Sequence, residues 1–187
     1  MMGTAERLLR GIDTVDANGE PVRYRYLQPS DDIDALTELL HAAYASLAKA
    51  GMRFVASHQD ADVTRQRVAK GETIVGVVEA KVIGTITLAG TDATSGSAFY
   101  DRTDVASVGQ FAVEPSLQTR GIGRMLLRLA EQRATEQGAG YLALDTSEHA
   151  ERLIALYERW GFSFVEYSRW SAVNYRSVVM AKRPESV

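Results

Sequence analysis

Apolar and polar positions recur with two distinct periods in the first part of the chain, and each period indicates one kind of element. Val22–Leu27 alternates apolar or aromatic residues with polar ones, as a half-buried strand does. Apolar residues then recur at helical spacing and predict a helix over about Ile33–Lys49. Asp31 or Asp32 can cap the start of this helix, and Gly51 is expected to end it.

The next part of the chain predicts a short helix, a hairpin and a long loop. The helix is expected over Asp60–Lys70. Two runs rich in β-branched residues, Thr73–Val78 and Val82–Leu88, are joined by Glu79-Ala80-Lys81 and predict a hairpin. Gly90–Ser107 is rich in Thr, Ser, Gly and Asp, and we interpret it as a surface loop.

The remaining elements alternate between strands and helices. The patterns predict a strand over Val108–Val113, a helix from Ile122, a strand over Tyr141–Asp145, a helix over Glu148–Trp160, and strands over Phe162–Tyr167 and Arg176–Ala181. A run of antiparallel strands thus precedes strand–helix–strand crossovers. This order predicts an α/β (α+β) fold in which helices pack on a mixed sheet.

The length of 187 residues favours one domain with a substantial core. We expect residues 21–187 to form that domain and residues 1–20 to be an N-terminal extension of unassigned role. Within the extension, Leu8 and Leu9 suit a short helix, and Asn18-Gly19 is typical of a turn.

Composition narrows the class of protein. A net charge of −3 gives no electrostatic support for nucleic-acid binding. The chain has no cysteine, so it has neither disulfides nor thiolate metal sites, and we expect no metal. The N-terminus lacks the apolar core of a signal peptide, and no apolar run approaches the ~20 residues of a membrane span. We therefore expect a cytoplasmic protein without a membrane partner.

A strand, a glycine-bearing loop and a helix start follow one another between Val108 and Tyr141. Gly121 and Gly123 stand where the helix begins, and glycine lets a ligand approach the backbone closely. Free N–H groups and the helix dipole favour a phosphate there. The alternative is that the same glycines only form a tight junction between loop and helix and bind no ligand. The spacing matches neither a Rossmann fingerprint, because the third position is Leu126, nor a P-loop.

Three motifs in order resemble the GNAT superfamily of acyl-CoA-dependent acyltransferases. Gln118-Thr119-Arg120-Gly121-Ile122-Gly123 resembles its Q/R-x-x-G-x-G/A signature. Phe111–Pro115 resembles the end of the family's central strand, and Leu156–Phe162 resembles its L-Y-E-x-x-G-F element. Residues 175–182 resemble a common closing strand. The resemblance covers roughly residues 22–182.

The resemblance implies a mostly antiparallel sheet that splays between its fourth and fifth strands, with acetyl-CoA in the gap. The amides that would hold the CoA pyrophosphate belong to Gln118, Thr119, Arg120, Gly121, Ile122, Gly123 and Arg124. Phe111, Ala112 and Val113 would supply the strand edge for pantetheine, and the Val113 amide would bind the thioester carbonyl. Tyr157 matches the tyrosine that protonates the departing thiolate, although it also lies on an apolar helix face.

The sequence departs from the family pattern at Ala150, where many members carry a cofactor-binding Asn. Ser147 or His149 can substitute, but a solvent-facing role is the simpler interpretation of His149. The general base stays open. Where some members carry a Glu on the fourth strand, this sequence has Ser107 and Gln110 instead. The alternatives are Glu79, Asp101, Asp104, Glu114 and a water chain. Acceptor recognition is expected from Tyr44–Gln59, Phe99–Asp104 and Trp170–Tyr175.

The function implied is transfer of an acetyl group from acetyl-CoA to an amine of a small molecule, by direct attack in a ternary complex. A protein N-acetyltransferase, a non-catalytic acyl-CoA-binding module on the same fold and a nucleotide-binding protein are the alternatives. A homodimer is common in the family, but no stretch of this sequence indicates an interface.

Overall fold

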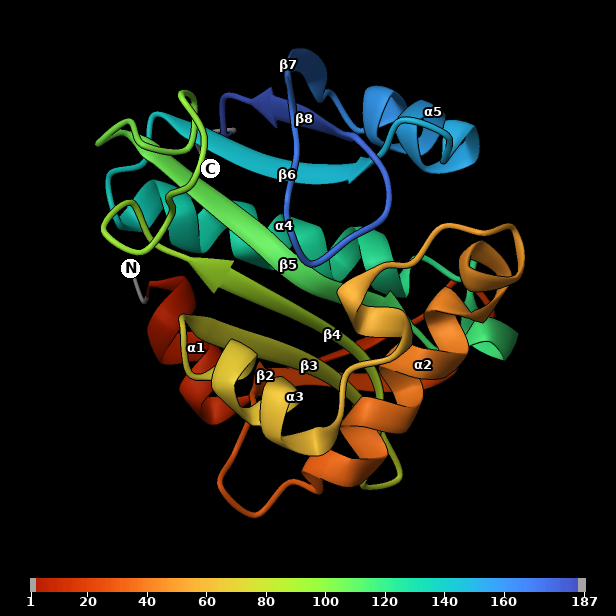
Figure 1. The fold of residues 1–187 in the computed structure, drawn as a ribbon. Coiled ribbons are helices and arrows are strands. Elements are labelled where there is room, and N and C mark those ends of the chain that lie inside the picture. Colours follow the sequence, from red (N-terminus) through yellow and green to blue (C-terminus); the bar gives the residue numbers. More distant parts are fainter. Residues whose placement is uncertain (1–2, 185–187) are drawn as a thin grey trace.

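The computed structural model describes residues 3–184, which form one eight-stranded sheet with helices on both faces (Figure 1). The strands follow one another across the sheet as β1 (Ile12–Val15), β2 (Pro21–Tyr26), β3 (Glu72–Val78), β4 (Lys81–Ala89), β5 (Val105–Val113), β6 (Tyr141–Ser147), β8 (Ser177–Lys182) and β7 (Ser163–Ser168). Neighbouring strands are antiparallel except β5 and β6, which are parallel. The mixed, mostly antiparallel sheet is therefore confirmed.

The helices of the described residues divide between the two faces of the sheet. They are α1 (Thr4–Arg10), α2 (Ile33–Lys49), α3 (Ala61–Val68), α4 (Ile122–Glu136) and α5 (Glu151–Arg159), with short 3₁₀ turns at Val55–Ser57 and Pro115–Leu117. In Figure 1, α2 and α3 lie on one face, while α4 crosses the other face and α1 lies beside it. No helix within residues 3–184 is long and apolar enough to span a membrane.

Aspartate caps start α2 and α3; a cap at Asp31 or Asp32 was predicted for α2, whereas none was predicted for α3. The Asp32 carboxylate accepts hydrogen bonds from the N–H groups of Asp34 and Ala35 at 2.9 and 3.1 Å. The Asp60 carboxylate accepts one from the N–H of Val63 at 2.8 Å. Each cap satisfies amides that the first helical turn leaves unpaired, and a cap of this kind is worth about 1 kcal/mol.

The main core fills the space between α4 and the sheet. It joins residues of β2, β3, β4 and β6 to the apolar face of α4, including the fully buried Leu126, Leu127 and Leu142. Leu8 of α1 is 0% exposed and belongs to the same core. The short helix predicted around Leu8 is thus confirmed, and it packs against the rest of the fold.

Two boundaries differ from the prediction by three residues each, and one strand was not predicted. The loop after β4 ends at Asp104 instead of Ser107, because Val105 and Ala106 are fully buried and pair with β6. Helix α5 begins at Glu151, three residues after the predicted start, because β6 continues through Ser147. Strand β1 was not predicted, since four residues carry too little alternation to be distinguished from a loop.

Strands β5 and β6 are the fourth and fifth of the predicted strands, because β1 was not predicted. They separate after a short paired stretch, which confirms the predicted splay. Only Val105–Ser107 pairs with Tyr141–Ala143, although β5 continues to Val113 and β6 to Ser147. The two strands that lie at the centre of the sheet therefore present unpaired backbone edges to each other beyond this point. This split positions the candidate site.

Candidate active site

A bulge in β5 lies beside the split. The register between β4 and β5 shifts between Thr85 and Thr87, where β5 carries one extra residue. Gln110 lies at this irregularity with a φ of 47°, a left-handed conformation that few side chains adopt. Bulges bend a strand and increase its twist. The bulge is therefore the local reason for β5 to turn away from β6.

The backbone beyond the bulge directs polar groups into the split. The Glu114 N–H donates to the Ile83 carbonyl oxygen of β4 at 2.8 Å. Hydrogen bonding alternates along an antiparallel pair, so the N–H of the preceding residue, Val113, points away from β4 and toward the split. On the same edge, the Phe111 carbonyl oxygen accepts a hydrogen bond from the Tyr44 hydroxyl at 3.0 Å.

The loop that leads into α4 exposes amides instead of capping them. Thr119 and Gly121 have φ values of 66° and 85°, and Gly121 is the N-cap residue of the helix. No side chain caps this end. The first amides of α4 therefore stay available, and consecutive amides around left-handed residues form an anion-binding concavity.

The first cavity, of about 430 Å³, lies between this loop, β5 and α5. Nine of the residues predicted to bind acetyl-CoA or to act in catalysis line it: Phe111, Ala112, Val113, Gln118, Thr119, Gly121, Gly123, Arg124 and Tyr157. A Cβ atom on Gly123 would lie 3.4 Å from Val113 Cγ2 and 3.6 Å from Phe111 Cζ. The missing side chain at Gly123 therefore keeps the helix start open where it faces β5.

Two predicted residues of the loop point elsewhere. The Arg120 guanidinium lies 3.6 Å from the Asp16 carboxylate, and the Arg120 carbonyl oxygen accepts a hydrogen bond from the Ala17 N–H at 2.9 Å. The Ile122 side chain is 2% exposed and packs in the main core. Neither side chain lines the cavity, so only their backbone groups remain available to a ligand.

Tyr157 lies at the junction of two cavities. Its ring packs edge-on against Trp160 and Phe162, and the residue is buried on the inner side of α5. Burial raises the pKa of the Tyr157 phenol well above its usual range, and the nearby Tyr44 and Asp145 raise it further. The phenol therefore keeps its proton at neutral pH and can donate it.

The second cavity, also of about 430 Å³, shares Tyr44, Leu153 and Tyr157 with the first. All three segments expected to recognise the acceptor contribute to it, through Tyr44, Phe54, Tyr100, Trp170 and Tyr175. Phe99 instead packs edge-on against Tyr141, with ring centroids 5.6 Å apart. The second cavity thus has aromatic walls and adjoins the first at Tyr157.

Asp145 is the one carboxylate among the described residues that line the second cavity. Trp170 Nε1 donates to it at 2.9 Å and the Tyr100 hydroxyl at 3.3 Å. Burial raises the pKa of this carboxyl, although hydrogen bonds from Ser177, Trp170 and Tyr100 act to lower it. Asp145 was not predicted as a site residue; its position at the end of the alternating run Tyr141–Asp145 was the available signal.

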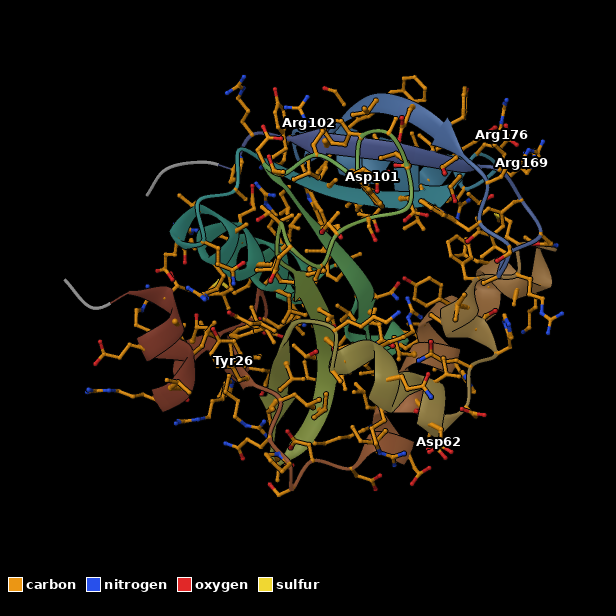
Figure 2. All side chains as sticks on the ribbon, turned by 60° about the vertical axis from the view of Figure 1, so that its left-hand side comes forward. Tyr26, Asp62, Asp101, Arg102, Arg169 and Arg176 are labelled. Atoms are coloured by element: carbon orange, nitrogen blue, oxygen red, sulfur yellow. The ribbon has the colours of Figure 1, made fainter. Side chains whose placement is uncertain are left out.

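The carboxylates that were considered as bases from the sequence lie outside both cavities. Asp101 accepts a hydrogen bond from the Gly96 N–H, and Asp104 pairs with Arg102 in a loop on the surface (Figure 2). Glu114 lies 3.6 Å from Lys81, and Glu79 is exposed in the β3–β4 turn. Ser107 and Gln110 do line the second cavity. Among residues 3–184, no group of three or more Asp, Glu or His side chains is placed to hold a metal ion.

Neither Ser147 nor His149 is placed to replace the cofactor-binding Asn that many family members carry at the position of Ala150. Ala150 is 3% exposed and packs against Met52, Phe54 and Tyr175. The Ser147 hydroxyl is buried and accepts a hydrogen bond from the His149 N–H at 3.2 Å. The His149 side chain is 71% exposed, as the simpler interpretation predicted. Neither side chain lines the first cavity.

Comparison with known proteins identifies the family. Residues 33–162 match the acetyltransferase (GNAT) family. The S-(2-succino)cysteine N-acetyltransferase of Bacillus subtilis (strain 168) is 30% identical over 142 residues, which are 75% of this chain and 83% of that protein.

Solved structures of low sequence identity share the fold. The GNAT domain of S. lividans PAT has a TM-score of 0.68 at 20% identity, over 92% of this chain and 96% of that one. A GNAT family acetyltransferase from Elizabethkingia anophelis, solved with acetyl-CoA bound, has a TM-score of 0.60 at 15% identity, over 87% and 97%. The chain therefore belongs to the GNAT family of acetyltransferases, enzymes that transfer an acetyl group from acetyl-CoA.

Proposed function

We propose that this enzyme acetylates the amino group of a small molecule by direct attack on acetyl-CoA in a ternary complex. The observation that carries the proposal is the pair of cavities that meet at Tyr44, Leu153 and Tyr157. One cavity suits the acyl donor and the other suits the acceptor. Reaction at the junction requires no covalent enzyme intermediate, and the chain has no cysteine to form a thioester.

The first cavity suits acetyl-CoA in its charge and its backbone geometry. We assign the pyrophosphate to the amides from Gln118 to Arg124, where the helix start is uncapped and Gly123 leaves the approach open. The Arg124 side chain stacks over the Trp160 ring at 5.6 Å and adds positive charge to the rim. The pantetheine arm would follow Phe111–Val113, whose backbone edge faces the split.

The second cavity suits a small amine. Asp145 gives it negative charge, and aromatic rings from Phe54, Tyr100 and Trp170 surround the space. An ammonium group is attracted both by a carboxylate and by aromatic faces. The name of the Bacillus subtilis relative, S-(2-succino)cysteine N-acetyltransferase, describes an acceptor of this size class and supports the proposal.

The chemistry follows from the groups at the junction. Asp145 draws the ammonium in and takes one proton from it, because its raised pKa makes it a stronger proton acceptor than an ordinary carboxylate. Asp145 then releases this proton to water. The neutral amine forms a bond to the acetyl carbon while the Val113 N–H stabilises the oxyanion. When the carbon–sulfur bond breaks, its electron pair goes to sulfur, which takes the proton of Tyr157. The surplus proton on the new amide nitrogen leaves through water and restores the phenol.

Release of free CoA thiol from acetyl-CoA, measured against a panel of amines, tests the proposal. Amine-dependent thiol release with a product heavier by one acetyl group is the expected result. Thiol release only with proteins or peptides would instead identify a protein N-acetyltransferase. Tight acetyl-CoA binding without turnover on any amine would identify a non-catalytic module. Thermal protection by ATP or NAD that exceeds protection by acetyl-CoA would identify a nucleotide-binding protein.

A further inference from the structure

Arg67 of α3 reaches the second cavity without forming an ion pair with any described residue. Burial lowers the pKa of its guanidinium, and Asp145 of the same cavity acts from a longer distance to raise it. The guanidinium donates a hydrogen bond to Gln59 Oε1 at 2.5 Å, and no carboxylate oxygen of the described residues lies within ion-pair distance. Other partly buried arginines are paired: Arg25 lies 2.7 Å from Asp31, and Arg133 lies 2.7 Å from Glu72. A partly buried cation that no carboxylate contacts is costly, so its retention in a cavity indicates an external partner.

A chain of hydrogen bonds fixes how Arg67 is presented. Because arginine only donates, Gln59 must turn its oxygen toward Arg67 and its nitrogen away. Gln59 Nε2 then donates to Thr64 at 2.6 Å and to Gln110 Oε1 at 2.8 Å. Gln110 consequently accepts through its oxygen, and its amide nitrogen has no partner among the described residues.

Within residues 3–184, an unsatisfied amide donor and an arginine without an ion pair thus lie together in the lining of the cavity. Gln110 is 4% exposed and lies on the bulge of β5, while Arg67 approaches from α3, and both line the second cavity. Lys70, just after α3, adds another positive charge to the lining. Asp145 enters the same cavity from β6, across the split from Gln110. The cavity therefore has one cationic and one anionic region.

We propose that the amine acceptor also carries a carboxylate, which the Arg67 guanidinium and the Gln110 amide hold together. This inference rests on the proposed function of the second cavity. The planar fork of arginine matches a carboxylate with two parallel hydrogen bonds. With Asp145 attracting the amine, the complementary acceptor is a zwitterion, such as an α-amino acid or a derivative of one. Arg67 lies outside the first cavity, so the CoA phosphates do not satisfy it.

The test compares matched acceptors that differ only in the carboxylate. Each α-amino acid is assayed beside its decarboxylated amine and its methyl ester, with thiol release from acetyl-CoA as the readout. We expect kcat/KM to be higher for the carboxylate-bearing member by on the order of 10- to 100-fold. Equal kcat/KM within the pairs, with turnover present, would overturn the inference and leave the proposed function standing.

Variants of α3 separate recognition from structure. In R67Q, KM for the carboxylate-bearing acceptor should rise by on the order of 10- to 100-fold, while kcat for that acceptor changes little. The kcat/KM for the decarboxylated amine should also change little. R67K keeps the charge and should recover part of the loss. The matched control is R65Q on the same helix, because Arg65 is 59% exposed and pairs with Asp62. Asp62 lies on the surface of the molecule (Figure 2). An equal loss for both acceptor types in R67Q and R67K would show a structural role and overturn the inference.

A binding measurement decides the question even if no amine is turned over. Succinate, propionate and inorganic phosphate are titrated calorimetrically into the CoA-bound protein. We expect the carboxylates to bind the wild type and R65Q but not R67Q. Carboxylate binding that survives in R67Q, absence of carboxylate binding to the wild type, or tighter binding of phosphate would overturn the inference. Lack of turnover together with Arg67-dependent carboxylate binding would refute the proposed function alone.

Discussion

The Tyr44 hydroxyl donates a hydrogen bond to the Phe111 carbonyl oxygen at 3.0 Å and so ties α2 to the unpaired edge of β5. This edge faces the split between β5 and β6, and Tyr44 lines both cavities. Burial raises the pKa of the Tyr44 phenol to about 12, so the hydroxyl stays protonated and keeps donating throughout the physiological range. Tyr44 thereby positions the strand that the acyl donor is proposed to follow.

Replacing Tyr44 by Phe tests that positioning role. Loss of one hydrogen bond to a backbone carbonyl should lower the free energy of unfolding by about 0.5–1.5 kcal/mol. KM for acetyl-CoA should rise by about 2- to 10-fold, because the edge of β5 is less constrained. Denaturant unfolding and steady-state kinetics measure the two effects. Tyr167→Phe on the exposed face of β7 is the control, and equal kinetics in both variants would contradict the role of Tyr44.

Replacing Tyr157 by Phe tests the general acid. We expect kcat to fall by about 100-fold or more, since a positioned proton donor contributes on that scale. Burial raises the pKa of Tyr157, so deprotonation of the phenol should not reduce wild-type kcat anywhere below about pH 10. The pH dependence of kcat for both proteins checks this. An unchanged kcat in Tyr157→Phe across pH would leave Tyr157 as a packing residue only.

Replacing Asp145 by Asn should separate activity from stability. KM for the amine should rise by about 10-fold or more, because the cavity loses its negative charge. The folded-state pKa of Asp145 is raised, so its ionisation destabilises the fold as pH rises from about 4 through that pKa. The asparagine side chain of the variant cannot ionise. The Tm of the variant relative to wild type should therefore be higher at pH 7 than at pH 4.5.

Thermal unfolding at the two pH values and amine saturation curves measure these effects. Asparagine replaces one of the two oxygens that accept from Trp170 and Tyr100 with an N–H donor, which lowers the Tm of the variant at both pH values. The difference between the pH values is therefore the informative quantity. If the Tm of the variant relative to wild type instead falls as pH rises, the raised pKa assigned to Asp145 is contradicted. An unchanged KM would remove Asp145 from amine binding.

Replacing Gly123 by Ala distinguishes a ligand site from a tight junction. A Cβ there lies at ordinary contact distances from Val113 and Phe111, so the fold should tolerate it. Helix propensity favours Ala over Gly by up to about 1 kcal/mol, so Tm should be unchanged or higher. KM for acetyl-CoA should rise by about 10-fold, because the methyl group occupies the opening at the helix start. Unchanged KM would support a purely structural glycine.

Much of the fold follows from local pattern. The periodicities, the cap expected at Asp31 or Asp32 and the glycine loop predicted most elements within a few residues, because each depends on neighbours in sequence. The turn between β3 and β4 formed even though Glu79 and Ala80 adopt positive φ values, which their residue types do not favour. The two flanking strands therefore determined this hairpin more than its turn did.

The polar part of the second cavity could not be predicted in the same way. Arg67 stands among charged neighbours on a short helix, and Asp145 ends an alternating strand, so both resemble surface residues in sequence. They share a cavity only because β5 bends at Gln110 and leaves β6. A non-glycine residue at a left-handed bulge gives no local sequence signal.

The most direct test of the central claim is an initial-velocity study of thiol release in which acetyl-CoA and the acceptor amine are both varied. Direct transfer between two adjoining cavities predicts intersecting lines in double-reciprocal plots, because both substrates must be bound before any thiol leaves. Parallel lines would indicate a covalent acetyl-enzyme, and thiol release that does not depend on any amine would contradict the acceptor site itself.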